Sequence, residues 1–130
     1  MKWYLRAMQN YITFSGRARR RELWYFFLFY FLAILAVSQI AIMTLYSQGA
    51  PPGGTTMFPV AAAINLLVLG HILPALAVEV RRLHDIGRSG WWLLIAALPI
   101  VGAIILIFWF VQPGTTGPNR FGADPKAAAA

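Results

Sequence analysis

Long apolar runs separated by short polar segments dominate the chain. Residues 23–46, 58–78 and 91–111 each form a run without Asp, Glu, Lys or Arg. Each run reaches the length of about 20 residues that a helix needs to cross a hydrocarbon core of about 30 Å. The pattern therefore predicts an all-α, polytopic integral membrane protein. We expect three transmembrane helices within a single membrane domain, residues 1–130.

The pattern leaves two paths open for the third run. Pro99 and Gly102 interrupt it, and such residues are tolerated at membrane depth where neighbouring protein satisfies the freed backbone groups. We expect one straight crossing, which puts the irregular, Gly- and Pro-rich tail of residues 113–130 outside. The alternative is a re-entrant hairpin of two half-helices, each about 12–17 Å long, which returns the tail to the cytoplasmic side.

Residues 1–15 follow a helical period with a polar side. One continuous arc of the helical wheel holds apolar and aromatic side chains, among them Trp3, Tyr4 and Ala7, while Lys2 and Arg6 lie opposite. This pattern predicts a short amphipathic helix in the headgroup region of a membrane. The same arc also suits packing against the protein's own helices, and both uses are compatible.

Composition excludes a water-soluble domain and several kinds of chemistry. Hydrophobic residues make up 59% of the chain and charged residues 12%, about half the share of charged residues in an average soluble protein. A soluble fold of this length has too little interior to bury so much apolar surface. The absence of cysteine excludes a disulfide framework, a thiolate metal site and a thiol nucleophile.

The net charge of +7 indicates how the chain is oriented. Six of the eleven Lys and Arg residues precede the first run and three lie in residues 79–90, whereas residues 47–57 carry no charge. The positive-inside rule therefore predicts a cytoplasmic N-terminus and a flexible outer loop at residues 47–57. Nucleic acid is not an expected partner, because the basic segment 16–22 is held at the bilayer surface.

The most distinctive polar segment is residues 79–92. If the second helix continues to Asp85, spacings of three or four residues place Glu79 beside Arg82, and Asp85 beside both Arg81 and Arg82. One interpretation is a charged helix end whose ion pairs reduce the cost of desolvation. The other is a polar site at the membrane boundary, including His84, that binds an anionic headgroup or a small anion, or relays protons.

Two further polar residues, Asn65 and His71, lie inside the second apolar run, where water cannot satisfy them. Hydrogen bonds between helices are the usual role of such side chains. A proton or transport path through His71 and Glu79 is the alternative.

Support for an enzyme is weak. Ser89 lies in a G-x-S-G pattern at residues 87–90, as around the serine of rhomboid-type proteases, but this chemistry also needs a placed base and an oxyanion site. The simpler interpretation makes Gly87 the end of the second helix and Ser89 the cap of the third. His84 and Asp85 point about 100° apart on a helix, which disfavours a metal site with Glu79. We expect no catalytic residue, no metal and no cofactor.

Several motifs, in order along nearly the whole chain, resemble one family. They are Trp3-Tyr4-Leu5, Asn10-Tyr11, Phe14-x-Gly16-Arg17-Ala18-Arg19-Arg20, Arg81-Arg82-Leu83-His84-Asp85 through Arg88-Ser89-Gly90-Trp91-Trp92, Pro99-x-x-Gly102, and Pro113-Gly114-Thr115-x-Gly117-x-Asn119-Arg120-Phe121-Gly122. In these the chain is similar to domain of unknown function 805 (DUF805), the YhaH-like small bacterial inner-membrane proteins. The resemblance implies a protein of the bacterial inner membrane and leaves its activity open. Its signature positions give the candidate binding residues Arg17, Arg19, Arg20, Arg81, Arg82, His84, Asp85, Arg88 and Arg120.

These observations favour a non-enzymatic membrane module that binds anionic lipid headgroups, or a partner, through its arginine-rich cytoplasmic face. The alternative is a small transporter or a proton- or anion-conducting subunit that uses His71, Glu79, Arg82 and Asp85, with Asn65 in the same intramembrane polar set. Three helices bury little of one another's surface, which favours a homo-oligomer or a complex with another membrane protein.

Overall fold

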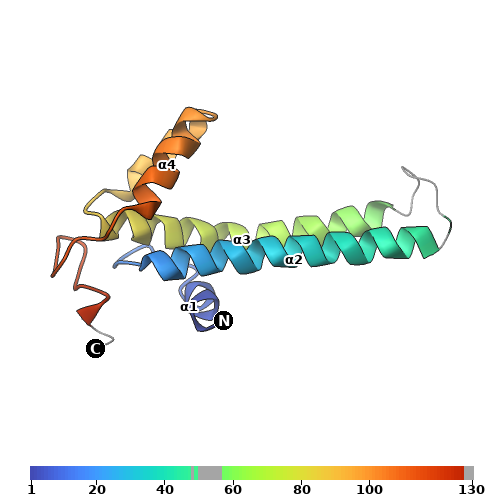
Figure 1. Cartoon of the computed structure of the whole chain (residues 1–130), viewed down its shortest axis with the longest axis horizontal. Coiled ribbons are helices and arrows are strands. Elements are labelled where there is room, and N and C mark those ends of the chain that lie inside the picture. Colours follow the sequence, from blue (N-terminus) through green and yellow to red (C-terminus); the bar gives the residue numbers. More distant parts are fainter. Residues whose placement is uncertain (48, 50–56, 128–130) are drawn as a thin grey trace.

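The computed structural model describes residues 1–47, 49 and 57–127 (Figure 1). Most of the expected outer loop at 47–57, and the last three residues of the tail, lie outside this range. The described helices are α1 (Lys2–Gln9), α2 (Arg20–Ser47), α3 (Met57–Asp85), the 3₁₀ helix η1 (Gly90–Ala97) and α4 (Val101–Val111). Apart from an isolated bridge between Asn119 and Gly122, no β-structure occurs among the described residues. The all-α prediction is therefore confirmed.

Helices α2 and α3 form a long antiparallel pair (Figure 1). Each is long and apolar enough to cross a membrane, and a helix of 28 residues extends about 42 Å. Helix α3 runs through Gly70 and Pro74 and continues past the apolar run to Asp85, so it carries the charged segment. We call the end formed by the start of α2 and the last two turns of α3 the charged end.

Helix α1 ends at Gln9, well before the expected residue 15, and lies across the pair near the charged end (Figure 1). Ala7 is fully buried, and Tyr4 and Met8 pack against the same core. Leu5 remains half exposed. Part of the predicted apolar arc therefore packs on the protein's own helices, while the location of α1 at a membrane surface stays a prediction.

The straight helix expected over residues 91–111 is wrong, because the chain reverses direction between η1 and α4. Pro99 lacks a backbone N–H, and Ile100 adopts φ +65° and ψ −64° with Val101 N donating to the Pro99 carbonyl at 2.7 Å. This is a γ-turn with positive φ, a rare and strained conformation. Gly102 then packs against the Ile95 carbonyl, where a Cβ would overlap the backbone.

The reversal makes η1 and α4 a helical hairpin that leans away from the α2–α3 pair (Figure 1). Its base is held by Trp92 and Trp109, whose rings meet edge to face at 5.4 Å. The chain therefore returns to the charged end before the tail begins, which is the path of the alternative hairpin and not that of the straight crossing. The tail itself is irregular in its described part, as predicted.

The turn between α3 and η1 has the structure predicted from Gly87 and Ser89. Gly87 adopts φ +77°, with Gly87 N donating to His84 O at 3.0 Å and Arg88 N donating to Leu83 O at 2.9 Å. This pair of bonds is the Schellman motif. The Ser89 hydroxyl accepts a hydrogen bond from Trp91 N at the start of η1. The predicted roles of Gly87 and Ser89 in ending one helix and capping the next are confirmed.

Candidate functional site

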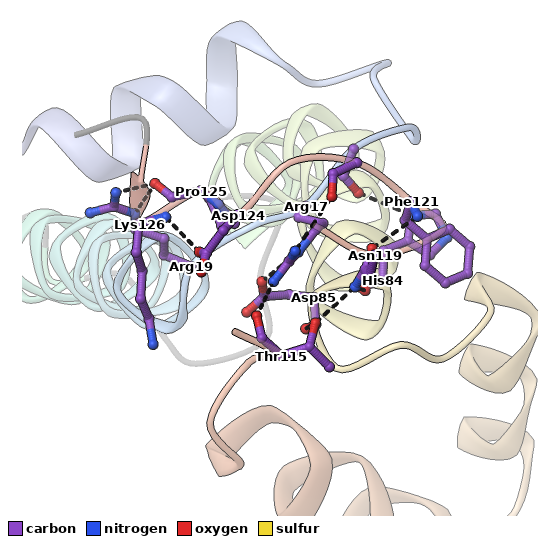
Figure 2. Close-up of polar contacts among 12 residues, drawn as sticks. Arg17, Arg19, His84, Asp85, Thr115, Asn119, Phe121, Asp124, Pro125 and Lys126 are labelled. Carbon is purple, nitrogen blue, oxygen red and sulfur yellow. Dashed lines mark hydrogen bonds and ion pairs between the residues drawn. The ribbon is translucent and has the colours of Figure 1, made fainter. Parts of the chain in front are cut away.

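A buried carboxylate, Asp85, joins two arginines from different parts of the chain. Its Oδ1 accepts from Arg17 Nε at 3.0 Å and its Oδ2 accepts from Arg82 Nη1 at 2.5 Å. All three residues are more than nine-tenths buried, and Arg82 is completely buried. The segment before α2 is thus tied to the last turn of α3, as Figure 2 shows for Arg17 and Asp85.

A second buried ion pair joins α2 to α3. Arg81 Nη1 donates to Glu22 Oε1 at 2.6 Å, and both side chains are almost fully buried. Arg6 of α1 lies 3.8 Å from the other Glu22 oxygen, but its side chain is half exposed. Arg81 Nη2 has no hydrogen-bond partner among the described residues. Glu22 is therefore the principal partner of Arg81.

Three buried arginines face two buried carboxylates, and backbone carbonyls supply the remaining acceptors. Arg82 donates to the carbonyls at the end of α4, and Arg17 donates to those of the tail. The acceptors are Phe110 O and Gln112 O for Arg82, and Thr115 O at 2.5 Å and Gly117 O at 2.6 Å for Arg17. Because buried charges need such partners, the tail is part of the cluster's structure.

The tail also packs directly on Asp85 (Figure 2). Thr115 donates to the Asp85 carbonyl twice, from its N–H at 2.9 Å and from its hydroxyl at 3.1 Å. A Cβ at Gly114 would overlap the Asp85 carboxylate. The Gly-Thr pair of the tail motif therefore allows backbone to approach the carboxylate closely.

His84 is enclosed by the tail and the segment before α2. Its Nδ1 lies 3.1 Å from the Gly16 carbonyl, and its ring stacks on Phe121 with centroids 3.9 Å apart and 4° between the planes (Figure 2). Asn119 Nδ2 donates to the His84 carbonyl at 2.9 Å. These contacts make His84 a docking point for the tail.

Asp124 fixes a turn in the tail. It accepts from Lys126 N at 2.8 Å and from Gly117 N at 3.0 Å. These backbone donors, Lys126 first, hold the pKa of the Asp124 carboxyl below its ordinary value. Arg19 donates to the Pro125 carbonyl from Nε at 2.7 Å, which ties this turn to the segment before α2.

His71 lies deeper in the helix pair and is satisfied within it. Its Nδ1 lies 2.8 Å from the Leu67 carbonyl and its Nε2 lies 2.9 Å from the Tyr4 hydroxyl. Since a carbonyl oxygen only accepts, Nδ1 is the donor in the first contact. The Tyr30 ring stacks on it at 4.7 Å. The expected hydrogen bond between helices is thus present, and it fastens α1 to α3.

The other predicted residues lie apart from the buried cluster. Asn65 faces outward, and Glu79 is partly exposed without a hydrogen bond or ion pair among the described residues. Arg88 lies over the Trp109 ring at 4.1 Å. Arg20 and Arg120 are exposed, and each donates to one backbone carbonyl, of Val111 and of Gly87 respectively.

Two of the three predicted ion pairs are wrong. The pairing of Asp85 with Arg82 is confirmed, but within the described part of the chain Arg82 does not pair with Glu79, and Arg81 pairs with Glu22 and not with Asp85. Short-range spacing cannot account for partners that come from distant segments. Glu22 is the only acid before the first apolar run, which is the one signal that singles it out, whereas the acceptors of the tail carry no side-chain signal.

Two features bear on the weaker expectations of a metal site and of a catalytic serine. Within the described residues, no three His, Asp or Glu side chains come together as a metal site requires. Ser89 is engaged as a helix cap, and the His84 ring is stacked on Phe121. What the charged end does present is a buried ionic cluster surrounded by exposed arginines.

Comparisons with known proteins place the chain in a group of membrane proteins. The family described as "Protein of unknown function (DUF805)" matches residues 11–123. The chain is 40% identical over 126 residues to inner membrane protein YhaH of Escherichia coli strain K12, covering 97% of this chain and 98% of the relative. It is 41% identical over 128 residues to inner membrane protein YhaI of the same strain, covering 97% of each.

A more distant relative is the uncharacterized protein YiiR of that strain, 33% identical over 139 residues, covering 88% of this chain and 86% of the relative. No solved structure matches the chain. The names of the first two relatives, together with two apolar helices of spanning length, support a location in the inner membrane. The chain belongs to the DUF805 family.

Proposed function

We propose that the protein is a non-enzymatic module of the inner membrane whose charged end binds anionic lipid headgroups. The observation that carries this proposal is that nine of its eleven basic residues fall into two sets, one buried and one exposed. The buried set, Arg17, Arg81 and Arg82, is occupied by internal partners. The exposed set points outward from the same end of the molecule.

The exposed set is formed by six cations: Lys2, Arg6, Arg20, Arg21, Arg120 and Lys126. Among the described residues, only Arg6 of these has a carboxylate within 4.0 Å. A cation near an anionic membrane surface contributes about 1 kcal/mol to binding. The set is therefore available to attract phosphate headgroups.

Exposed apolar and aromatic side chains adjoin these cations. On and after α1 they are Leu5, Tyr11, Ile12 and Phe14, and at the start of η1 Trp91 is 80% exposed. A surface that combines cations with such side chains suits the boundary between headgroups and acyl chains. We therefore place α1 and the charged end at the cytoplasmic headgroup layer.

The proposed topology has two crossings and one half-crossing. α2 and α3 span the bilayer, while the hairpin enters from the cytoplasmic side and returns. The two helices of the hairpin, η1 and α4, have about the same length, since eight residues of 3₁₀ helix and eleven of α-helix each extend about 16 Å. That is half of a hydrocarbon core of about 30 Å. Both termini are then cytoplasmic.

The transport alternative has less support from the geometry. Arg82 and Asp85 are bonded to each other and to backbone groups, and both ring nitrogens of His71 lie against internal partners. A proton or anion path needs groups that exchange partners easily. Only Glu79 of the proposed path has no partner among the described residues.

Removing exposed cations is expected to weaken binding of anionic lipid. At about 1 kcal/mol per cation, the triple variant Lys2→Gln/Arg6→Gln/Arg21→Gln should bind phosphatidylglycerol roughly a hundredfold more weakly at low salt. The measurement is native mass spectrometry of the full chain in mild detergent, titrated with phosphatidylglycerol and, separately, phosphatidylcholine.

The matched control keeps the charge: Lys2→Arg/Arg6→Lys/Arg21→Lys should bind like the unchanged protein. Binding should also weaken as salt is raised, because the exposed charges are screened. Equal retention of the two lipids by the unchanged protein, or an unaltered affinity in the triple Gln variant, would refute the proposal.

A further inference from the structure

Two amide side chains face outward from the apolar part of the helix pair. Gln39 lies on α2 and Asn65 on α3, both exposed. Asn and Gln side chains within membrane spans typically hydrogen-bond to a neighbouring helix. An outward amide at this depth therefore indicates that the bundle is completed by something beyond one copy of the chain.

The hydrogen bonds of these amides are incomplete. Asn65 Nδ2 donates to the Ala61 carbonyl at 2.7 Å, which leaves its oxygen available, and Gln39 makes no hydrogen bond within the described residues. By contrast, the neighbouring hydroxyls of Ser38 and Thr44 are each bonded to a carbonyl four residues earlier. Lipid tails offer no acceptor or donor, so these amides need a polar partner.

The two amides lie at the same level along the pair. The ion pair between Glu22 and Arg81 shows that these two residues lie at about the same level along the antiparallel helices. The distance from Glu22 forward to Gln39 on α2 is nearly the same as the distance from Arg81 back to Asn65 on α3. These lengths are about 26 and 24 Å at a rise of about 1.5 Å per residue. The two levels therefore differ by little more than the rise of a single residue.

The side chains of the two amides point away from the helix pair on different sides. Ala41 lines the groove between the helices with Val60. Gln39 precedes it by two positions, and since each position turns the helix by about 100°, it points to nearly the opposite side of α2. Asn65 lies six positions before buried His71, which turns it about 120° from that residue. A two-fold symmetric contact between two copies would pair Gln39 with Gln39 through α2, or Asn65 with Asn65 through α3. A head-to-tail contact, with α2 of one copy against α3 of the next, pairs Gln39 with Asn65.

We infer that copies of this chain associate head to tail in the membrane, with α2 of one copy against α3 of the next and Gln39 hydrogen-bonded to Asn65 of the next copy. We choose a second copy as the partner because a copy inserted in the same membrane orientation presents the complementary amide at the same level along the helix pair. An amide both donates and accepts, so the pair satisfies both side chains. Because such contacts keep every copy at the same depth, they form a ring around an axis along the membrane normal when the rotation between neighbouring copies closes.

The absence of cysteine allows a direct test by cross-linking in native membranes. In the double variant Gln39→Cys/Asn65→Cys, oxidation with copper phenanthroline is expected to give a ladder of dimers, trimers and larger species that disappears on reduction. The matched control is Gln39→Cys/Leu66→Cys. Leu66 is 71% exposed and adjoins Asn65 in sequence, but it points about 100° away and should give no ladder.

Three results would overturn the inference. They are the absence of intermolecular bands from the double variant, an equal ladder from the control, and dimers from Gln39→Cys alone, which indicate a symmetric contact. Independently, copies with two different tags should co-purify, and Asn65→Leu should reduce their co-purification at least fivefold. Unchanged co-purification of this variant would also contradict the inference.

Discussion

The Asp85→Asn protein is expected to lose about 3–5 kcal/mol of stability, the usual effect of removing one partner from a buried ion pair. In the unchanged protein one carboxylate oxygen accepts from Arg17 and the other from Arg82. Asparagine replaces one oxygen with an amino group, which then faces an arginine donor. Two buried guanidinium groups are left without a counterion.

The measurement is unfolding of the full chain in detergent micelles by titration with dodecyl sulfate, followed by the fluorescence of its five tryptophans. Asp124→Asn is the matched control. Asp124 also accepts two hydrogen bonds within the tail, but from backbone N–H groups near the surface. We expect its unfolding midpoint to shift much less. Equal midpoints for Asp85→Asn and the unchanged protein would show that this ionic bridge does not hold the charged end together.

Glu22→Gln is expected to cost about 3 kcal/mol, because it removes the charged partner of buried Arg81. Arg81 keeps one backbone acceptor, the Ala77 carbonyl at 3.3 Å, and its Nη2 already has no partner among the described residues. The charge of Arg81 therefore has no other nearby compensation within this part of the chain. The same unfolding titration measures the loss.

Arg6→Gln tests the exposed side of the same carboxylate. Arg6 lies 3.8 Å from Glu22 and is half exposed, and exposed ion pairs contribute about 0–1 kcal/mol. The expected order is therefore a large loss for Glu22→Gln and a small one for Arg6→Gln. The reverse order would contradict this account, because it would mean that the buried pair of Glu22 with Arg81 contributes little to stability.

The apolar pattern is sufficient to predict the helices of the pair. Runs at residues 23–46 and 58–78 lie within α2 and α3, because length and hydrophobicity determine which segments can span a membrane. The extensions beyond these runs carry the charged residues. They become helical because the cluster satisfies them at the charged end.

The third run shows where the pattern fails. The hydrophobicity of residues 91–111 suits one straight helix and a hairpin of two short helices equally well, so it does not discriminate between the two structures. The choice depends on Pro99, on the left-handed conformation of Ile100 and on the close approach at Gly102. Only the positions of Pro99 and Gly102 are visible in the sequence as breaks.

The partners of the arginines are the least predictable feature. Pairs such as Arg17 with Asp85 join segments far apart in the chain, and helical spacing carries no information at that range. The tail contributes mainly carbonyl groups, which every residue has. The motif of glycines, Thr115 and Asn119 in the tail is recognisable in the sequence. Its structural role, which is to pack on the end of α3, is apparent only from the contacts in Figure 2.

The proposed topology depends most on the hairpin, which returns the chain so that the tail closes the arginine cluster on the same side of the membrane as the N-terminus. The most direct test is to fuse alkaline phosphatase and, separately, green fluorescent protein to the C-terminus of the full chain in a bacterial inner membrane. We expect a fluorescent C-terminal fusion and an inactive phosphatase fusion. An active phosphatase with a dark fluorescent protein would place the tail outside and contradict this topology.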